Sequence, residues 1–179
     1  MDTLITYASE HGSTKEIAER INFVISAKTS PHETECIPIE QIADLSKYSY
    51  IVVGSAIHNM SWLPIASSFL HNNAPALSKV PVWAFSVGSP AGIPKFLKWL
   101  DAESKEQKNL ADTVNKDVKT QGHVLFSGKF LREHAPPLLG WIWSSVGGQF
   151  GDFRDWNQIE AWANKVGDEI AQKQRECEN

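Results

Sequence analysis

The sequence predicts an α/β fold in which a parallel sheet is covered by helices on both sides. Short β-prone segments alternate with helical segments along the chain, and parallel strands need crossovers of that kind. In addition, the segment 50–54 is almost continuously apolar, which is typical of a strand buried on both faces. We count five strands and expect a single domain over residues 1–179.

The first half of the chain alternates between β-prone segments and segments with the three- to four-residue periodicity of a helix. From Lys15 onward, apolar residues recur every three or four positions, which indicates a helix with one buried face. The expected elements are a strand over 3–8, a polar turn over 9–14, a helix from Lys15, a strand over 35–39, a helical turn over 42–45, a strand over 50–54 and a loop over 55–63.

The second half repeats the alternation. Pro64 suits the first turn of a helix, and Asp155 with Gln158 three residues later is typical of a helix N-terminus. The expected elements are a helix from Pro64, a strand over 81–87, helices over 93–100 and 103–120, a strand over 123–129 and a final helix that buries Ile159, Trp162, Ala163, Val166 and Ile170.

Composition excludes several classes of protein. The chain has 179 residues, of which 42% are hydrophobic and 21% charged, so it has enough apolar surface to fold. Its formal net charge of -4 and its pI near 5.9 provide no basic field for nucleic acid, and we expect no nucleic-acid partner. Cys36 and Cys177 form no CxxC pair, and no secretory leader precedes Leu4, so we expect a cytoplasmic protein.

The uncharged stretch between Lys47 and Lys79 does not predict a membrane span. A spanning helix needs about 20 consecutive apolar residues. Asn59, Pro64 and the pair Asn72-Asn73 divide the stretch into shorter apolar runs.

Three loops follow strands one, three and four, where doubly wound sheets bind their ligands. These loops are 9–14, 55–62 and 86–92. The first has three hydroxyl side chains and one glycine directly before a helix, a combination that predicts a site for one phosphate. It lacks both the Walker A lysine and a GxGxxG pattern, which favours a terminal phosphomonoester. The alternative is that these serines and threonines only cap the helix.

Residues 6–18 (TYASEHGSTKEIA) resemble the FMN-phosphate signature of flavodoxin-like proteins. The resemblance extends over essentially the whole chain and is greatest to the subgroup of menaquinone-dependent protoporphyrinogen dehydrogenases. The segments that carry it are Val52–Ile57, Ala84–Val87, Val146–Gly148 and Asp155–Trp156. It implies a flavodoxin-like three-layer sandwich, a five-stranded parallel sheet in the order 2-1-3-4-5, and one bound FMN.

The resemblance also implies the cofactor contacts. They are Ser9, Glu10, His11, Gly12, Ser13, Thr14, Ser55, Ala56, Ile57, His58, Trp62, Ser86, Val87, Gly88 and Ser89. We expect Glu10 to contribute its backbone N–H and to point its carboxylate outward, because that charge would repel a phosphate. Trp62 either stacks on the flavin or packs against the helix that begins at Pro64.

Two features separate this sequence from a simple electron shuttle. The loop 87–92 has no aromatic residue to stack on a flavin. A long connection, 130–155, joins the last strand to the last helix and contains an apolar run with Leu138, Trp141, Ile142 and Trp143. This run can lie at a membrane surface, cover a quinone or porphyrinogen, or pack on the core; its basic neighbours Lys129, Arg132 and Arg154 lie near its ends.

Other chemistries lack their signatures. The loop serines do not show the G-x-S-x-G spacing of a hydrolase, and the six histidines form no HxxxH or HxH pair, so we expect neither a catalytic side chain nor a metal. His11 and His58 either bond the cofactor or face solvent. We therefore expect an FMN-dependent oxidoreductase acting on a quinone- or porphyrinogen-type molecule. The alternatives are an electron carrier that docks to redox proteins and a binding module without cofactor.

Overall fold

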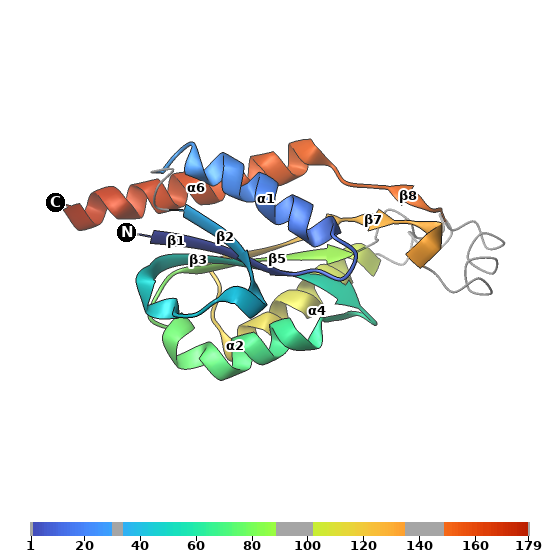
Figure 1. Ribbon diagram of the computed structural model, residues 1–179, viewed down its shortest axis with the longest axis horizontal. Coiled ribbons are helices and arrows are strands. Elements are labelled where there is room, and N and C mark those ends of the chain that lie inside the picture. The colour runs from blue at the N-terminus through green and yellow to red at the C-terminus, as the bar shows by residue number, and fades with distance from the viewer. Residues whose placement is uncertain (1, 30–33, 89–101, 135–148, 179) are drawn as a thin grey trace.

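The computed structural model describes residues 2–29, 34–88, 102–134 and 149–178 (Figure 1). Five strands form a parallel sheet in the order β2-β1-β3-β5-β6. Their bounds are β1 Asp2–Ala8, β2 Thr34–Pro38, β3 Tyr48–His58, β5 Val82–Gly88 and β6 Gly122–Ser127. The predicted order 2-1-3-4-5 is confirmed, since β5 and β6 are the fourth and fifth parallel strands along the chain.

Helices cover both faces of this sheet, as the sequence predicts (Figure 1). Helices α1 (Ser13–Ser26) and α6 (Trp156–Glu178) pack on one face, and α2 (Pro64–Leu77) and α4 (Ala102–Asp117) pack on the other. Each face has its own apolar core. The core under α1 and α6 includes Ile5, Ile17, Val52, Phe85 and Ile159, and the core under α2 and α4 includes Leu4, Val53, Phe69, Ala84 and Val114.

The central strand β3 explains why the sequence pattern is continuous. Ile51, Val52 and Val53 are each at most 1% exposed, although successive side chains of a strand point to opposite faces. Val52 enters one core and its two neighbours enter the other. The strand therefore needs an apolar residue at every position here, which an alternating pattern would not supply.

The predicted loop 55–63 is largely wrong. Strand β3 continues to His58, and β4 (Ser61–Trp62) pairs antiparallel with its end. The turn between them is Asn59-Met60, whose φ angles are 50° and 59°. Two consecutive left-handed residues are typical of a tight hairpin turn, and asparagine tolerates that conformation whereas methionine gives no such signal.

Other boundaries shift by smaller amounts. Helix α1 begins at Ser13 instead of Lys15, and the expected helical turn over 42–45 is replaced by two 3₁₀ turns, η2 (Ile39–Gln41) and η3 (Leu45–Lys47). The N-terminus of α6 is as predicted, because Asp155 Oδ1 accepts from the N–H groups of Asn157 and Gln158 at 3.0 and 3.1 Å.

The expected strand 123–129 divides into two elements. β6 ends at Ser127, and β7 (Lys129–Phe130) pairs antiparallel with β8 (Gly151–Asp152) in a separate two-stranded sheet, followed by the 3₁₀ turn η5 (Arg132–His134) after β7. The expected helix 93–100 and the apolar run with Leu138, Trp141, Ile142 and Trp143 lie outside the described residues. Within the described parts of the chain, no helix has the length and apolarity needed to cross a bilayer.

Candidate functional site

A cavity of about 170 Å³ lies where the carboxyl ends of β1, β3 and β5 meet. Ten of its lining residues belong to the predicted contact set: Ser9, Glu10, His11, Ser13, Thr14, Ala56, Ile57, His58, Val87 and Gly88. Small-molecule sites usually enclose about 300–1,000 Å³. This cavity therefore suits one end of a ligand, such as its phosphate.

Sequence reasoning missed three lining residues, Gly128, Lys129 and Phe130. They directly follow β6, and the last two of them form β7. The fold brings them to residues 9–14 through contacts that span more than a hundred positions, such as the bond between Lys129 N and Ser13 Oγ at 3.0 Å. No local pattern signals such a contact.

The loop between β1 and α1 has the geometry of an anion site. Gly12 has φ 83°, in the left-handed region that favours glycine, and its N–H donates to Ser9 Oγ at 3.1 Å. The first main-chain bond of the helix runs from Glu16 N to Gly12 O at 3.0 Å. The N–H groups of Ser13, Thr14 and Lys15 precede that bond and have no carbonyl within the helix to receive them. They lie at the positive end of the helix dipole.

The hydroxyl groups around this helix end fit a phosphate. Ser9 Oγ accepts from Gly12 N, and Ser13 Oγ accepts from Lys129 N. Each of these hydroxyls thus uses an acceptor position on the protein, and its O–H proton can be donated to a ligand. Thr14 adds a third hydroxyl and is 1% exposed. A phosphate needs many donors and offers none at neutral pH except its residual proton, so the donor set matches its chemistry.

The acidic residue of the loop is paired with a neighbouring histidine. Glu10 Oε2 lies 3.4 Å from His58 Nδ1, and the side chain of Glu10 is 43% exposed. Its carboxylate is thus partly exposed and lies beside an imidazole, and Glu10 is one of the residues that line the cavity. His11 is exposed beside it.

Four predicted contacts within the described residues do not line the cavity: Gly12, Ser55, Trp62 and Ser86. Gly12 shapes the loop. Ser55 is fully buried and bonds the main chain, donating to Ala56 O at 2.8 Å and accepting from Leu63 N at 3.1 Å. Trp62 is 5% exposed, and its Nε1–H donates to the buried Ser86 Oγ at 2.7 Å. Trp62 thus has the position expected for the packing alternative. Ser89 lies outside the described residues.

A buried histidine extends the contact between Trp62 and Ser86. His123 Nε2 lies 2.8 Å from Ser86 Oγ. Burial lowers the pKa of His123 to about 4, so the ring is neutral near pH 7. His123 faces Ala84 in the register of β5 and β6, and this pairing, which sequence alone does not reveal, sets its place. The three side chains join β4, β5 and β6 behind the cavity.

An ion-pair cluster includes Lys129, which lines the cavity, and three residues that do not. Lys129 Nζ contacts both oxygens of Glu16, at 2.7 and 2.8 Å. Arg154 Nη1 contacts Glu16 Oε2 at 2.6 Å, and Arg154 also binds both oxygens of Asp152. Hydrogen bonds from Lys129 and Arg154 hold the pKa of Glu16 below its ordinary value. This cluster fastens β7 and β8 to the first turn of α1.

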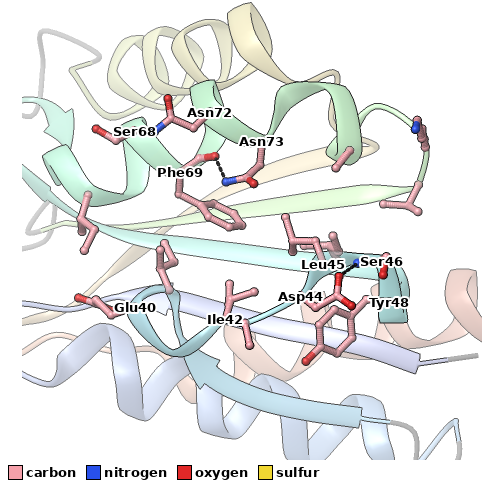
Figure 2. A pocket seen from close by; sticks show the side chains of 17 residues that line it. Glu40, Ile42, Asp44, Leu45, Ser46, Tyr48, Ser68, Phe69, Asn72 and Asn73 are labelled. Carbon is pink, nitrogen blue, oxygen red and sulfur yellow. Dashed lines mark hydrogen bonds between the residues drawn. The ribbon is translucent and has the colours of Figure 1, made fainter.

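A larger cavity of about 790 Å³ lies elsewhere, between α2 and the two 3₁₀ turns (Figure 2). Ile42, Leu45 and Phe69 line it, and Asn73 Nδ2 there donates to Phe69 O at 2.9 Å. It shares no lining residue with the smaller cavity, and the N-terminus of α1 and the hydroxyls of Ser9, Ser13 and Thr14 belong to the smaller one. We therefore assign the candidate cofactor site to the smaller cavity.

Two other chemistries, a metal centre and a Cys36 nucleophile, find no support in the described part of the chain. No three His, Cys, Asp or Glu residues among the described ones gather in a cluster that could hold a metal ion. Burial raises the pKa of the Cys36 thiol to about 12, so it is not a nucleophile at neutral pH.

The family comparison identifies the domain. A family model described as Flavodoxin domain matches residues 4–133, which include β1 from Leu4 onward, the loop 9–14 and the other four strands of the parallel sheet. No curated protein matches the chain significantly.

Solved structures share the fold. A flavodoxin from the domain Archaea is 16% identical with a TM-score of 0.57, and the match covers 97% of this chain and 98% of that one. Oxidised flavodoxin 2 from Bacillus cereus is 18% identical with a TM-score of 0.54, covering 97% and 99%. The rubredoxin oxygen:oxidoreductase from Desulfovibrio gigas is 15% identical with a TM-score of 0.54; the match covers 96% of this chain but 36% of that one.

Proposed function

The chain belongs to the flavodoxin domain family, and from that premise we propose that it is a redox protein that binds one FMN with its phosphate at the N-terminus of α1. FMN, when bound, supplies the redox chemistry, because the flavin ring accepts and returns electrons. The protein binds and orients the cofactor and shields it from water. We propose no catalytic side chain.

The observation that carries this proposal is the convergence of unpaired donors in the 170 Å³ cavity. The hydroxyls of Ser9 and Ser13 each accept one main-chain N–H, which leaves their protons for an anion. Thr14 and the first amides of α1 point to the same helix end. A cap alone would need only one such hydroxyl, so the helix-capping alternative accounts for fewer of these residues.

Apolar side chains line the cavity beside the proposed phosphate position and suit the flavin ring. Ala56 and Ile57 come from the end of β3, Val87 from the end of β5, and Phe130 from β7. Phe130 also stacks on Phe150, with ring centroids 5.0 Å apart. These side chains exclude water from the ligand, and exclusion of water strengthens the hydrogen bonds that hold the phosphate.

We further propose an oxidoreductase that uses a quinone- or porphyrinogen-type molecule, as in the protoporphyrinogen dehydrogenase subgroup. The long connection 130–155 supports this reading, because connections of that length are uncommon without a function. An apolar substrate or a membrane surface would meet Leu138, Trp141, Ile142 and Trp143, and the protein would work in the cytoplasm or at the inner face of a membrane.

The second candidate is an electron carrier that docks to redox proteins. It is favoured by the solved flavodoxins that match nearly the full length of this chain. Turnover of a quinone or porphyrinogen by the FMN-loaded protein favours the enzyme. Electron transfer to protein partners alone, unaffected by removal of residues 135–148, favours the carrier.

The phosphate site is tested with Thr14→Val and Ser9→Ala. Loss of one hydrogen bond to a charged group costs about 1.5–3 kcal/mol, so each substitution should weaken FMN binding by roughly 10- to 100-fold. Flavin fluorescence on titration with protein measures the dissociation constant.

Thr29→Val is the matched control, because Thr29 lies just beyond the other end of α1 and its Oγ1 donates to Ile25 O at 3.1 Å. It should leave FMN affinity unchanged. If Thr14→Val and Ser9→Ala bind FMN as tightly as the unaltered protein, the phosphate does not lie at this helix end.

A further inference from the structure

We propose that Lys129 is a phosphate-binding residue of this site and that its ammonium group makes the site prefer FMN to riboflavin, the same flavin without a phosphate. This inference rests on the proposed function. Lys129 lies outside the loops that the sequence marks as cofactor-binding, and the fold places it there.

The main chain fixes Lys129 against both loops that bound the phosphate position. Gly128 N donates to Gly88 O at 2.7 Å, and Lys129 N donates to Ser13 Oγ at 3.0 Å. A Cβ at Gly128 would lie 2.8 Å from Val87 Cγ1 and 3.1 Å from Ser13 Oγ. A side chain at position 128 would therefore force its neighbours to shift, and glycine lets this part of the chain lie close to Val87 and Ser13.

The ammonium group of Lys129 has a donor to spare. It carries three N–H bonds, and two of them are directed at Glu16 Oε1 and Oε2. The Lys129 side chain is 26% exposed, and the residue lines the cavity together with Ser9, Ser13 and Thr14. The third N–H can therefore bond a phosphate oxygen while the ion pair with Glu16 stays intact.

The positive charge of Lys129 matters because the phosphate and two nearby carboxylates are all negative. A phosphate monoester carries nearly two negative charges at neutral pH, and Glu10 and Glu16 both lie close to the helix end. Among the described residues that line the cavity, Lys129 is the only lysine or arginine. It is therefore the cation best placed to offset the charge of the phosphate.

Arg154 keeps Lys129 available for this role. Its guanidinium supplies a second bond to Glu16 Oε2, at 2.6 Å, and is held by both oxygens of Asp152. The Arg154 side chain is 5% exposed, whereas Glu16 and Asp152 are 45% and 44% exposed. Because Glu16 has two cationic partners, a shift of Lys129 toward a phosphate does not leave its carboxylate unpaired.

The test compares FMN and riboflavin on Lys129→Met. The expected result is a dissociation constant for FMN raised by about 10- to 100-fold, the range for loss of a charge-assisted hydrogen bond, with the riboflavin constant unchanged. Lys129→Arg should retain most of the preference for FMN, because it keeps the positive charge.

Lys28→Met is a matched control. Lys28 pairs with Asp168 at 2.5 Å, and its side chain is 27% exposed, nearly the same fraction as for Lys129. This ion pair joins α1 to α6, and its removal should change neither constant. If Lys129→Met changes both constants by the same factor, or changes neither, Lys129 does not bind the phosphate.

Two further arms separate the alternatives. If Glu16→Gln restores full FMN affinity to Lys129→Met, Lys129 acts only by neutralising Glu16, and direct binding is refuted.

In the unaltered protein, FMN affinity should fall more steeply with added NaCl than riboflavin affinity, and equal slopes would contradict the proposal even if Lys129→Met did not fold. An unaltered protein that binds no flavin refutes the proposed function itself, whereas FMN binding without an effect of Lys129 refutes this inference alone.

Discussion

At the scale of single residues, some of the predicted contact residues line the cavity and others form hydrogen bonds within the protein near it. Ser86 belongs to the second group, because its hydroxyl lies between Trp62 Nε1 and His123 Nε2 at 2.7 and 2.8 Å. It is fully buried and does not line the cavity. The carboxyl end of β5 is therefore joined to β4 and β6 through side-chain hydrogen bonds.

The neutral state of His123 predicts how stability depends on pH. Its pKa is about 4 in the folded protein and 6.5 when exposed, so the unfolded chain takes up the proton first as pH falls. The unfolding free energy should fall between pH 6.5 and pH 4, by about 1.4 kcal/mol per pH unit from this group. Chemical denaturation at pH 7 and pH 5 measures the change.

His123→Gln should reduce this loss between pH 7 and pH 5 by about 2 kcal/mol, because glutamine does not titrate. His71→Gln is the control, since the His71 side chain is 77% exposed and its Nδ1 lies 3.1 Å from Asp117 Oδ1 at the end of α4. Identical pH dependence in the unaltered protein and His123→Gln would mean that His123 is not buried as a neutral ring.

At the scale of elements, the α1 N-terminus and its preceding loop could be predicted from the sequence, because hydroxyls and a glycine before a helix are a local signal. The pairs β3–β4 and β7–β8 could not. Strand β4 needs two left-handed residues at Asn59-Met60, and β7 finds β8 only after a separation of about twenty residues along the chain. Lys129 was missed for the same reason, since its contacts to Ser13 and Glu16 arise only in the folded chain.

The close contacts at Gly128 predict that the position of β7 affects the loop 9–14 and the start of α1. Gly128→Ala would place a Cβ 2.8 Å from Val87 Cγ1 and 3.2 Å from Gly88 O, so the strand must move outward. We expect a loss of about 1–3 kcal/mol in unfolding free energy, as for overpacking, together with weaker FMN binding. Thermal denaturation and flavin titration measure the two effects.

Gly122→Ala provides the comparison, because the nearest atom to a Cβ there is 4.0 Å away. It should change FMN affinity much less. Equal FMN affinities for Gly128→Ala and the unaltered protein would show that β7 and the phosphate loop are independent.

At the scale of the whole molecule, the parallel sheet separates the cofactor edge from the chain termini. Figure 1 shows both termini at one end of the sheet and β7 and β8 at the other. Ion pairs join the two helices of one face along their length, including Arg20–Glu160 at 2.6 Å and Lys28–Asp168 at 2.5 Å. These ion pairs join α1, which begins at the candidate phosphate site, to the last helix of the chain.

The larger cavity beside α2 and the smaller one at the N-terminus of α1 give two positions at which a flavin could be tested. The central claim is that FMN binds at the carboxyl edge of β1, β3 and β5 with its phosphate at α1, and not in the larger cavity beside α2. Backbone amide NMR of the uniformly ¹⁵N-labelled protein during titration with FMN tests this claim most directly. We expect the largest shifts at Gly12, Ser13 and Thr14, and at the neighbouring amides of Ile57 and Gly88. Shifts confined to residues 40–46 and 65–73, or no shifts at all, would contradict it.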